Sequence, residues 1–378
     1  MRRFLPPFLI TITFGLAWTT FGAVSTGLFF VAVVACLAWP IFVLVKAVRS
    51  GTASGSLLGA TASALCLVVL VTVFIAVPGD FHRDHSHRDD NLADHPDFGW
   101  LPTLREGDAQ KGLTVEATVG QRLEIVDPSR EHIVLMGDSV MYGWGVGDEE
   151  TAGAFLAQKM DAAQVVNASV SGYAIDQYYL YLKDKLPLLR PKVVVVGVYA
   201  GNDYEATGRD NWYGHRKPLF VPDGESIRLK DPSKPDLNCV DLLAQSLLFH
   251  FLWKDLEVGQ AVLNLVCNTT SLSDEDRAVV VRRLLDKTAE LVSAHDARLL
   301  WVLLPDRNDW RKNSWYTNEK TRYPHLARIL KETGHEVLWL YDVFDAYEDK
   351  DALYLPDDSA HYSVLGNQVL ADALAKRL

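Results

Sequence analysis

A serine, a carboxamide and an imidazole occur where apolar segments of the sequence end. Ser139 follows the apolar run "IVLM" through "GDS", Asn202 follows "VVVVGVYAG", and His361 lies in "DDSAHYS" near the end of the chain. A serine hydroxyl is a weak nucleophile that needs a base near neutral pH, and histidine supplies one. This set of residues therefore indicates nucleophilic acyl chemistry.

Acyl transfer needs two further features, and the sequence offers both. The imidazole needs a carboxylate on its other nitrogen, and Asp358 lies three residues before His361. The tetrahedral intermediate needs hydrogen-bond donors for its oxyanion. The backbone N–H groups of Ser139 and Gly172 and the side-chain amide of Asn202 would supply them.

Each of these residues also has a purely structural interpretation. Ser139 could cap a helix, a role that serine fills well. Gly172 could supply a backbone bend, and Asn202 could form a turn. His361 could begin a helix that Asp358 caps. These interpretations must all hold together at four separate segment ends, so the chemical one is favoured.

The elements that must position these residues follow a strand–helix alternation. The strand candidates are Ile133–Met136, Gln164–Val170, Lys192–Tyr199, Arg298–Leu304 and Glu336–Tyr341. The helix candidates are Ala152–Ala162, Asp176–Leu189, Asp274–Ala294, Asn318–Thr333 and Ser363–Leu378. Such alternation predicts a parallel sheet covered by helices on both faces, with the active residues at the carboxyl ends of the strands.

At these residues the chain resembles the SGNH, or GDSL-type, hydrolases. Four blocks carry the resemblance, in order: Ser139 in "GDS", Gly172 in "VSGY", Asn202 in "GND" and His361 in "DSAH". The family's aspartate corresponds to Asp358, and the neighbouring Asp357 fits less well. Val140 replaces the leucine of GDSL, a conservative change, and Asp138 is expected to be structural. The resemblance implies a three-layer α/β/α sandwich of flavodoxin-like type with a mostly parallel five-stranded sheet, and ester hydrolysis or transfer without a metal or cofactor.

The first 78 residues contain three long segments without a charged residue. They are Leu9–Val24, Gly27–Val45 and Ser56–Val77, each close to the roughly 20 residues that cross a hydrocarbon core. We therefore expect residues 1–78 to form an all-α transmembrane region in the lipid bilayer, with helices at about 8–24, 27–45 and 56–77. The extended block "GDSVMYGWGVGDEE" is also similar to that of bacterial envelope members of the family.

Basic residues predict the orientation of these segments. Arg2 and Arg3 precede the first, and Lys46 and Arg49 lie between the second and third. Both positions favour the cytoplasm, so the part after Asp80 is expected on the periplasmic or extracellular side of a bacterial inner or plasma membrane. A cleaved signal peptide is disfavoured because two more apolar segments follow. Were the first two segments a single embedded element, the soluble part would lie on the other side.

The rest of the chain divides into a linker and a domain. Residues 79–130 are expected to form the linker and the approach to a hydrolase domain at 131–378. An insertion at about 204–270, rich in Pro, Gly and Asp at its start, could be a substrate lid or simple decoration. The linker histidines lack a regular pattern, so no metal site is predicted there; they are His82, His85, His87 and His95.

The four cysteines divide between these regions. Cys36 and Cys66 lie in the apolar segments and are expected to be inert. Cys239 and Cys267 lie in the soluble part, where an oxidising compartment would permit a disulfide. Two free buried thiols are the alternative, and spacing alone does not decide between them.

The charge and the expected location of the protein limit the classes of partner and substrate that it could bind. Residues 1–80 have four basic residues and one acid, so the remaining 298 have a net charge of −14 against −11 for the whole chain. This excess of acid argues against nucleic acid as a partner, because phosphates require Lys and Arg. We expect an acylated envelope glycan, with O-acetyl as the acyl group, or a related ester. Aromatic residues near the expected site could stack on sugars or only pack, namely Trp144, Tyr173, Trp212 and Tyr213.

Three alternatives remain open at the level of the sequence. A lipid or lysophospholipid esterase would also suit a membrane tether. An acyltransferase would need a partner that brings the acyl donor across the bilayer. A catalytically idle module could bind or assemble a membrane complex through the transmembrane helices, although every expected catalytic position is filled.

Overall fold

A computed structural model describes residues 92–103, 118–160, 162–213, 215–230, 264–310 and 322–378. These residues belong to one compact unit formed by Ser86–Leu237 and Val262–Leu378. The expected transmembrane region, most of the linker and Cys239 lie outside the described residues. Within the described part, no helix is both long and apolar enough to span a bilayer.

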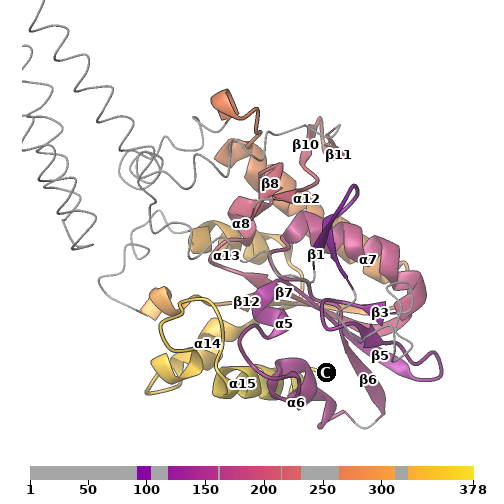
Figure 1. The fold of residues 1–378 in the computed structure, drawn as a ribbon, viewed down its shortest axis with the longest axis vertical. Helices are drawn as coiled ribbons and strands as arrows, with labels where there is room; N and C mark the ends of the chain where they lie inside the picture. Colours follow the sequence, from indigo (N-terminus) through magenta and orange to yellow (C-terminus); the bar gives the residue numbers. More distant parts are fainter. Residues whose placement is uncertain (1–91, 104–117, 161, 214, 231–263, 311–321) are drawn as a thin grey trace, which may run out of the picture. The chain divides into compact units, whose positions relative to one another are not determined.

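A five-stranded sheet forms the centre of this unit (Figure 1). Its strands in spatial order are β13 (Val337–Trp339), β12 (Arg298–Leu304), β7 (Pro191–Tyr199), β5 (Glu131–Met136) and β6 (Ala163–Asn167). All neighbouring pairs are parallel. Numbered by their order along the chain, the strands run 2-1-3-4-5 across the sheet, which is the flavodoxin-like order. The predicted parallel five-stranded sheet is confirmed.

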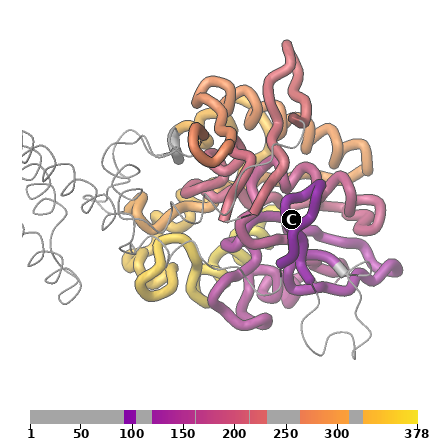
Figure 2. Tube along the Cα trace, turned by 45° about the horizontal axis from the view of Figure 1, so that its top comes forward, coloured from indigo at the N-terminus to yellow at the C-terminus, as the bar shows by residue number. Residues whose placement is uncertain are grey.

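Helices cover both faces of the sheet (Figures 1 and 2). One face is covered by α7 (Ile175–Leu189), α12 (Asp274–Ser293) and α13 (Arg322–Thr333). The other is covered by α6 (Ala152–Ala157), α14 (Leu340–Asp345) and α15 (Val364–Ala375). The described residues therefore form the three layers that the sequence predicts.

The pleat of β5 explains why both faces must be covered. Val134 and Met136 lie in the core on the α7 side, whereas Ile133 and Leu135 lie in the core on the α15 side. Successive side chains of a strand point to opposite faces, so a continuous apolar run is expected only for a strand buried on both sides. Each such side chain contributes about 1.5–3 kcal/mol when it is fully buried.

Several elements differ in length from their predictions, among them β6, β13 and α6. β6 ends at Asn167, three residues early, because the chain then turns toward Gly172. β13 ends at Trp339, and the next residues begin α14. α6 stops at Ala157 rather than at Ala162, since a turn closes there. In each case a turn or a new element begins where the local composition would allow the segment to continue.

Described residues from the expected linker and approach to the domain pack against the domain. β1 (Leu92–His95) and β2 (Gly99–Pro102) form an antiparallel pair, and Trp100 of this pair is 1% exposed in the α7-side core. β3 (Thr118–Val119) and β4 (Glu124–Ile125) form a second pair. The sequence missed this packing because short strands with polar residues lack a periodic signal.

The described parts of the insertion are likewise packed. They comprise α8 (Asp203–Ala206) and two hairpins, β8 (Asn211–Trp212) with β9 (His215–Arg216) and β10 (Phe220–Asp223) with β11 (Ser226–Leu229). Tyr204 and Phe220 belong to the core. The first half of the insertion is therefore an integral part of the domain rather than loose decoration.

Candidate active site

Ser139 begins the short helix α5 (Ser139–Tyr142) at the carboxyl end of β5. The residue that caps this helix is Asp138, whose side chain accepts a hydrogen bond from the Val140 N–H at 3.0 Å. The interpretation of Ser139 as the cap is therefore wrong, and its hydroxyl is available for another contact. Gly137 before it has no room for a side chain, because a Cβ there would lie 2.5 Å from that of Met141.

The hydroxyl of Ser139 contacts the imidazole of His361. Ser139 Oγ lies 2.8 Å from His361 Nε2, and His361 Nδ1 lies 2.6 Å from Asp358 Oδ2. Ser139 and His361 are 222 residues apart in sequence. The structure thus brings the three predicted residues into one hydrogen-bonded chain. In this chain a Ser139 Oγ proton can pass to Nε2 while Asp358 holds the proton on Nδ1.

Asp358 is held as an anion by its surroundings. Burial raises the pKa of this carboxyl, but the hydrogen bond and the charge of His361, with backbone N–H groups, outweigh burial and lower the pKa to about 2. The N–H groups of Ala360 and His361 donate to Asp358 Oδ1 at 2.7 and 3.0 Å. The rival Asp357 is exposed and has a left-handed backbone with φ 58°. The helix α15 is capped by Ser363, so neither His361 nor Asp358 serves as a simple helix start.

Arg307 supports the loop that carries Asp358 and His361. Its guanidinium donates to the carbonyls of Asp358 and Leu355 at 3.2 and 3.3 Å and pairs with Asp351 at 2.5 Å. Its own N–H donates to the Ser359 carbonyl at 2.8 Å. The sequence analysis missed this residue, because it lies after β12 and no local motif links it to the loop.

Gly172 occupies a turn that requires glycine. The Tyr173 N–H donates to the Val170 carbonyl at 3.2 Å, and Gly172 within this turn has φ +77°. A positive φ at the third residue of a turn is typical of type II turns, which favour glycine there. A Cβ at Gly172 would also lie 2.8 Å from the ring of Tyr213. The backbone bend that the sequence offers as the structural interpretation of Gly172 is therefore present.

Asn202 follows β7 and precedes α8, but its side chain does not cap that helix. Its Nδ2 donates to the Tyr213 hydroxyl at 3.3 Å. The next residue, Asp203, is fully buried, and its Oδ2 accepts hydrogen bonds from the Tyr199 N–H at 2.8 Å and the Tyr178 hydroxyl at 2.9 Å. Asp203 therefore fixes the turn, and the Asn202 side chain takes no part in capping α8.

Backbone contacts join the strand ends that carry these residues. The Val170 N–H donates to the Gly137 carbonyl at 3.1 Å, so the segment before Gly172 lies beside the segment before Ser139. Asp138 is 1% exposed, and burial raises its pKa to about 6, against the opposing effects of its bond to Val140 and the charge of His361. Its hydrogen bond to Val140 caps α5, which is a contact of the structural kind expected for Asp138.

The four aromatic residues singled out in the sequence have different positions. Trp144 is half-buried, with its ring centroid 6.0 Å from that of His361, and lines an open cavity of about 380 Å³ with Arg122, Tyr142 and Asp148 among others. Tyr173 is a core residue, 1% exposed, and donates to the Trp100 carbonyl. Stacking on a sugar is therefore excluded for Tyr173. Trp212 packs at the edge of the core.

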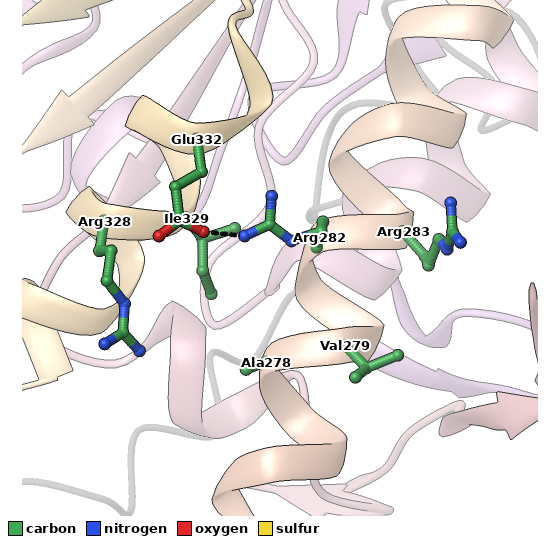
Figure 3. A pocket seen from close by; sticks show the side chains of 7 residues that line it. All are labelled: Ala278, Val279, Arg282, Arg283, Arg328, Ile329 and Glu332. Carbon is green, nitrogen blue, oxygen red and sulfur yellow. Dashed lines mark hydrogen bonds and ion pairs between the residues drawn. The ribbon is translucent and has the colours of Figure 1, made fainter. Parts of the chain in front are cut away.

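A larger cavity of about 420 Å³ lies between α12 and α13 (Figure 3). Arg282 points toward Glu332, with which it forms an ion pair, whereas Arg283 and Arg328 point away from each other. None of its lining residues belongs to the candidate site. In the described ranges, no three His, Cys, Asp or Glu side chains gather so as to hold a metal ion.

The structure contains a disulfide at Cys267, which is completely buried. Cys239 lies outside the described residues, so the pairing of Cys239 with Cys267 stays a prediction. The alternative of a free buried thiol is wrong for Cys267.

Several solved structures are similar to this chain. A lipase/acylhydrolase from Enterococcus faecalis is 14% identical, with 65% of this chain and 94% of that chain covered and a TM-score of 0.40. A lipolytic protein of the G-D-S-L family from Veillonella parvula DSM 2008 is 12% identical, with 65% and 97% covered and a TM-score of 0.37. An acetyl xylan esterase is 13% identical, with 65% and 99% covered and a TM-score of 0.39. No curated protein matches the chain.

The sequence also matches a family profile over most of the folded domain. The match is to the GDSL-like lipase/acylhydrolase family and extends over residues 135–369, from β5 to α15. This range includes Ser139, Gly172, Asn202, Asp358 and His361. Family membership implies ester hydrolase activity. The chain belongs to the GDSL-like lipase/acylhydrolase family.

Proposed function

We propose that the protein is a membrane-anchored serine esterase that removes O-acyl groups, in the first place O-acetyl, from an envelope glycan or a related ester. The observation that carries the proposal is the chain of contacts from Ser139 Oγ to His361 Nε2 at 2.8 Å and from Nδ1 to Asp358 at 2.6 Å. A catalytically idle module would have no need to keep all three groups aligned.

In the first half-reaction, Ser139 Oγ attacks the carbonyl carbon of the ester while His361 Nε2 takes the hydroxyl proton. The resulting imidazolium is stabilised by Asp358, which stays ionised because its pKa is about 2. The carbonyl π electrons move to oxygen, and the oxyanion is bound by the Ser139 N–H, the Gly172 N–H and Asn202 Nδ2. The tetrahedral intermediate then collapses, the alkoxy group leaves with the proton from Nε2, and an acyl-serine remains.

In the second half-reaction, water replaces the alcohol. His361 takes a proton from the water, whose oxygen attacks the acyl-serine, and the same three donors bind the second oxyanion. Breakage of the bond to Ser139 Oγ releases the acid and returns the proton to serine. If a second alcohol attacks instead of water, the same residues carry out acyl transfer.

The substrate part of the proposal rests on location and on one aromatic residue. The uncharged segments in residues 1–78 would hold the domain at a membrane, outside the cytoplasm, within reach of surface glycans. Trp144 lies beside His361, the group that protonates the leaving alcohol. An aromatic face at this position suits a sugar ring, because it offers a large apolar surface at low conformational cost.

Active-site labelling tests the chemical part of this proposal. The purified full-length protein should hydrolyse p-nitrophenyl acetate and react with a fluorophosphonate probe, and Ser139→Ala should abolish both. Ser359→Ala is the matched control, since this serine lies in the His361 loop without a contact to the imidazole, and it should retain both. Labelling that persists in Ser139→Ala would refute the assignment of the nucleophile.

A substrate screen tests the part of the proposal that concerns the substrate. O-acetylated glycans should be cleaved faster than long-chain acyl esters and lysophospholipids. A preference for lysophospholipids would instead support the lipid esterase. If the acyl group appears mainly on an acceptor glycan and little free acid is released, the protein is a transferase.

A further inference from the structure

Tyr213 contacts two of the residues proposed to bind the oxyanion. Its hydroxyl accepts the hydrogen bond from Asn202 Nδ2 at 3.3 Å. Its ring closes the space beside Gly172, where a Cβ would lie 2.8 Å from Tyr213 Cδ2 and 3.1 Å from Cε2. Tyr213 belongs to the insertion and to none of the four motif blocks. The contact therefore links the insertion to the proposed oxyanion site.

The backbone of Tyr213 is in an unusual conformation. Tyr213 follows β8 and has φ +47°, in the left-handed region that residues with a side chain rarely adopt. A bulky residue remains in this region only when its surroundings determine it, and such residues gather at functional sites. The position of this ring is thus set by the fold rather than by local preference.

A buried lysine anchors the segment that carries Tyr213. Lys217 and Asp176 form an ion pair at 2.5 Å, and both side chains are completely buried. Lys217 Nζ also donates to the carbonyls of Ala206 and Arg209 at 2.9 and 3.3 Å. Asp176 lies in the first turn of α7, four residues after Gly172. The ion pair therefore joins the segments on both sides of Tyr213 to the segment that begins at Gly172.

The contact at Asn202 determines what its amide can do. A primary amide has two N–H bonds in one plane, so a hydrogen bond made by one of them fixes the direction of the other. Asn202 Oδ1 is buried without a hydrogen-bond partner among the described residues. If the amide rotated, it would present this oxygen, and an acceptor would repel a developing oxyanion.

We propose that Tyr213 is a positioning residue of the oxyanion hole: its hydroxyl holds the Asn202 amide with an N–H toward the reacting carbonyl. This inference rests on the proposed function of Ser139, Gly172 and Asn202. The phenol stays protonated at neutral pH, because burial and then the charge of Asp138 raise its pKa to about 12. The hydroxyl thus remains a neutral acceptor for the amide over the working range.

A double-mutant cycle in the full-length protein tests this inference. With p-nitrophenyl acetate, Tyr213→Phe should lower kcat roughly tenfold with little change in KM, because the ring and its packing on Gly172 remain. Asn202→Ala should lower kcat by roughly 10²- to 10³-fold, as expected for the loss of one oxyanion donor. In the Asn202→Ala background, Tyr213→Phe should have no further effect, since the amide that it orients is gone.

Several outcomes would overturn the inference. One is an unchanged kcat in Tyr213→Phe, and another is the same fold-loss in both backgrounds, which would indicate a merely structural role. An unchanged kcat in Asn202→Ala would also refute it. Tyr179→Phe, which removes a phenol hydroxyl on α7 while its ring keeps the packing on Phe220, serves as the control and should leave kcat nearly unchanged.

The cycle also separates this inference from the proposed function. Activity that survives Ser139→Ala refutes the serine mechanism itself. Loss of activity in Ser139→Ala together with wild-type kcat in Tyr213→Phe refutes only the role of Tyr213. If Tyr213→Phe lowers the thermal midpoint so far that it cannot be assayed, the coupling is measured instead with Tyr213→His, which keeps an aromatic ring and a nitrogen that can accept the amide proton. This variant should be faster than Asn202→Ala, and equal or lower activity would count against the inference.

Discussion

The two sides of the proposed active site are built in different ways. The acid–base side, Asp358 and His361, comes from one loop, in which residues three apart contact each other through Nδ1 and Oδ2. The oxyanion side consists of Gly172, Asn202 and Tyr213, which follow three different strands. The first side depends on a local turn, whereas the second depends on the register of the sheet and on a packed insertion.

This difference has a physical consequence for mutations. The local side can lose one group without disturbing the other, because Arg307 and backbone N–H groups also hold the loop. The oxyanion side uses a backbone conformation that only glycine adopts easily and a ring packed against it. We therefore expect substitutions on the acid–base side to lower kcat with little change in the free energy of unfolding. Substitutions on the oxyanion side should lower both quantities.

The largest effect on activity is expected on the acid–base side. Asp358→Asn should lower kcat for p-nitrophenyl acetate by roughly 10⁴-fold, because an amide no longer holds the correct tautomer of His361 or stabilises its positive charge. The free energy of unfolding should change little in comparison, since Asn keeps an acceptor for the Ala360 and His361 N–H groups. Steady-state kinetics and chemical denaturation measure the two quantities. Asp357→Asn should keep wild-type activity; equal losses in the two variants would contradict the assignment of Asp358.

An intermediate effect is expected at Gly172. Gly172→Ala should lower kcat by roughly 10²-fold and destabilise the fold by about 1–3 kcal/mol, because it adds a side chain at φ +77° that meets Tyr213. Gly224→Ala is the matched control: its φ is +60° and nothing lies within 4 Å of the added Cβ. This control variant should lose stability but keep its activity. Kinetics combined with thermal unfolding distinguish the two variants, and comparable activities would argue against a role of Gly172 at the site.

The smallest effect on activity is expected at Asp138, which caps α5 and whose substitution should change stability rather than kcat. Burial raises its pKa to about 6 from the ordinary 3.8, so the folded state binds this proton more tightly than the unfolded state does. The stability contribution is present below about pH 4 and is lost as the pH rises through about 6. Asp138→Asn resembles the neutral acid and should equal the wild type near pH 4. Near pH 8 it should be more stable by about 1–3 kcal/mol.

Denaturation curves at the two pH values test this linkage. Glu149→Gln, an exposed acid of the following turn, is the control and should show no such pH-dependent gain. If the difference in stability between Asp138→Asn and the wild type is the same at both pH values, burial does not raise the pKa of this carboxyl.

The sequence predicted the sheet well, for reasons that lie in the residues themselves. Continuous apolar runs such as that of β12 indicate strands buried on both faces, and β12 has the predicted bounds. The motif residues lie at strand ends, where the hydrogen bonds of the ladder stop. The ends of β6 and α6 were predicted less well. After β6 the backbone bonds to distant residues, Gln121 and Gly137, whereas α6 ends in a local turn that its composition does not signal.

Other features carry no local signal. Trp100 follows a polar, turn-rich stretch and lies in the part expected to be linker and approach to the domain, yet it packs in the core. Arg307 and Lys217 act through carbonyls and carboxylates that lie far from them in sequence or in unrelated elements. Periodicity does not reveal such contacts, since a single residue that bonds to distant backbone has no pattern around it.

The sequence by itself determined the order of the elements and the types of residue available for chemistry, because apolar patterning and turn residues act over a few positions. It also determined the pairing of Asp358 with His361, which needs only a three-residue turn. Only the tertiary structure decided that Ser139 contacts His361 rather than capping its helix, and that Tyr213 lies against Gly172 and Asn202. These contacts join segments up to 222 residues apart, and their geometry follows from the packing of the whole sheet and its insertion.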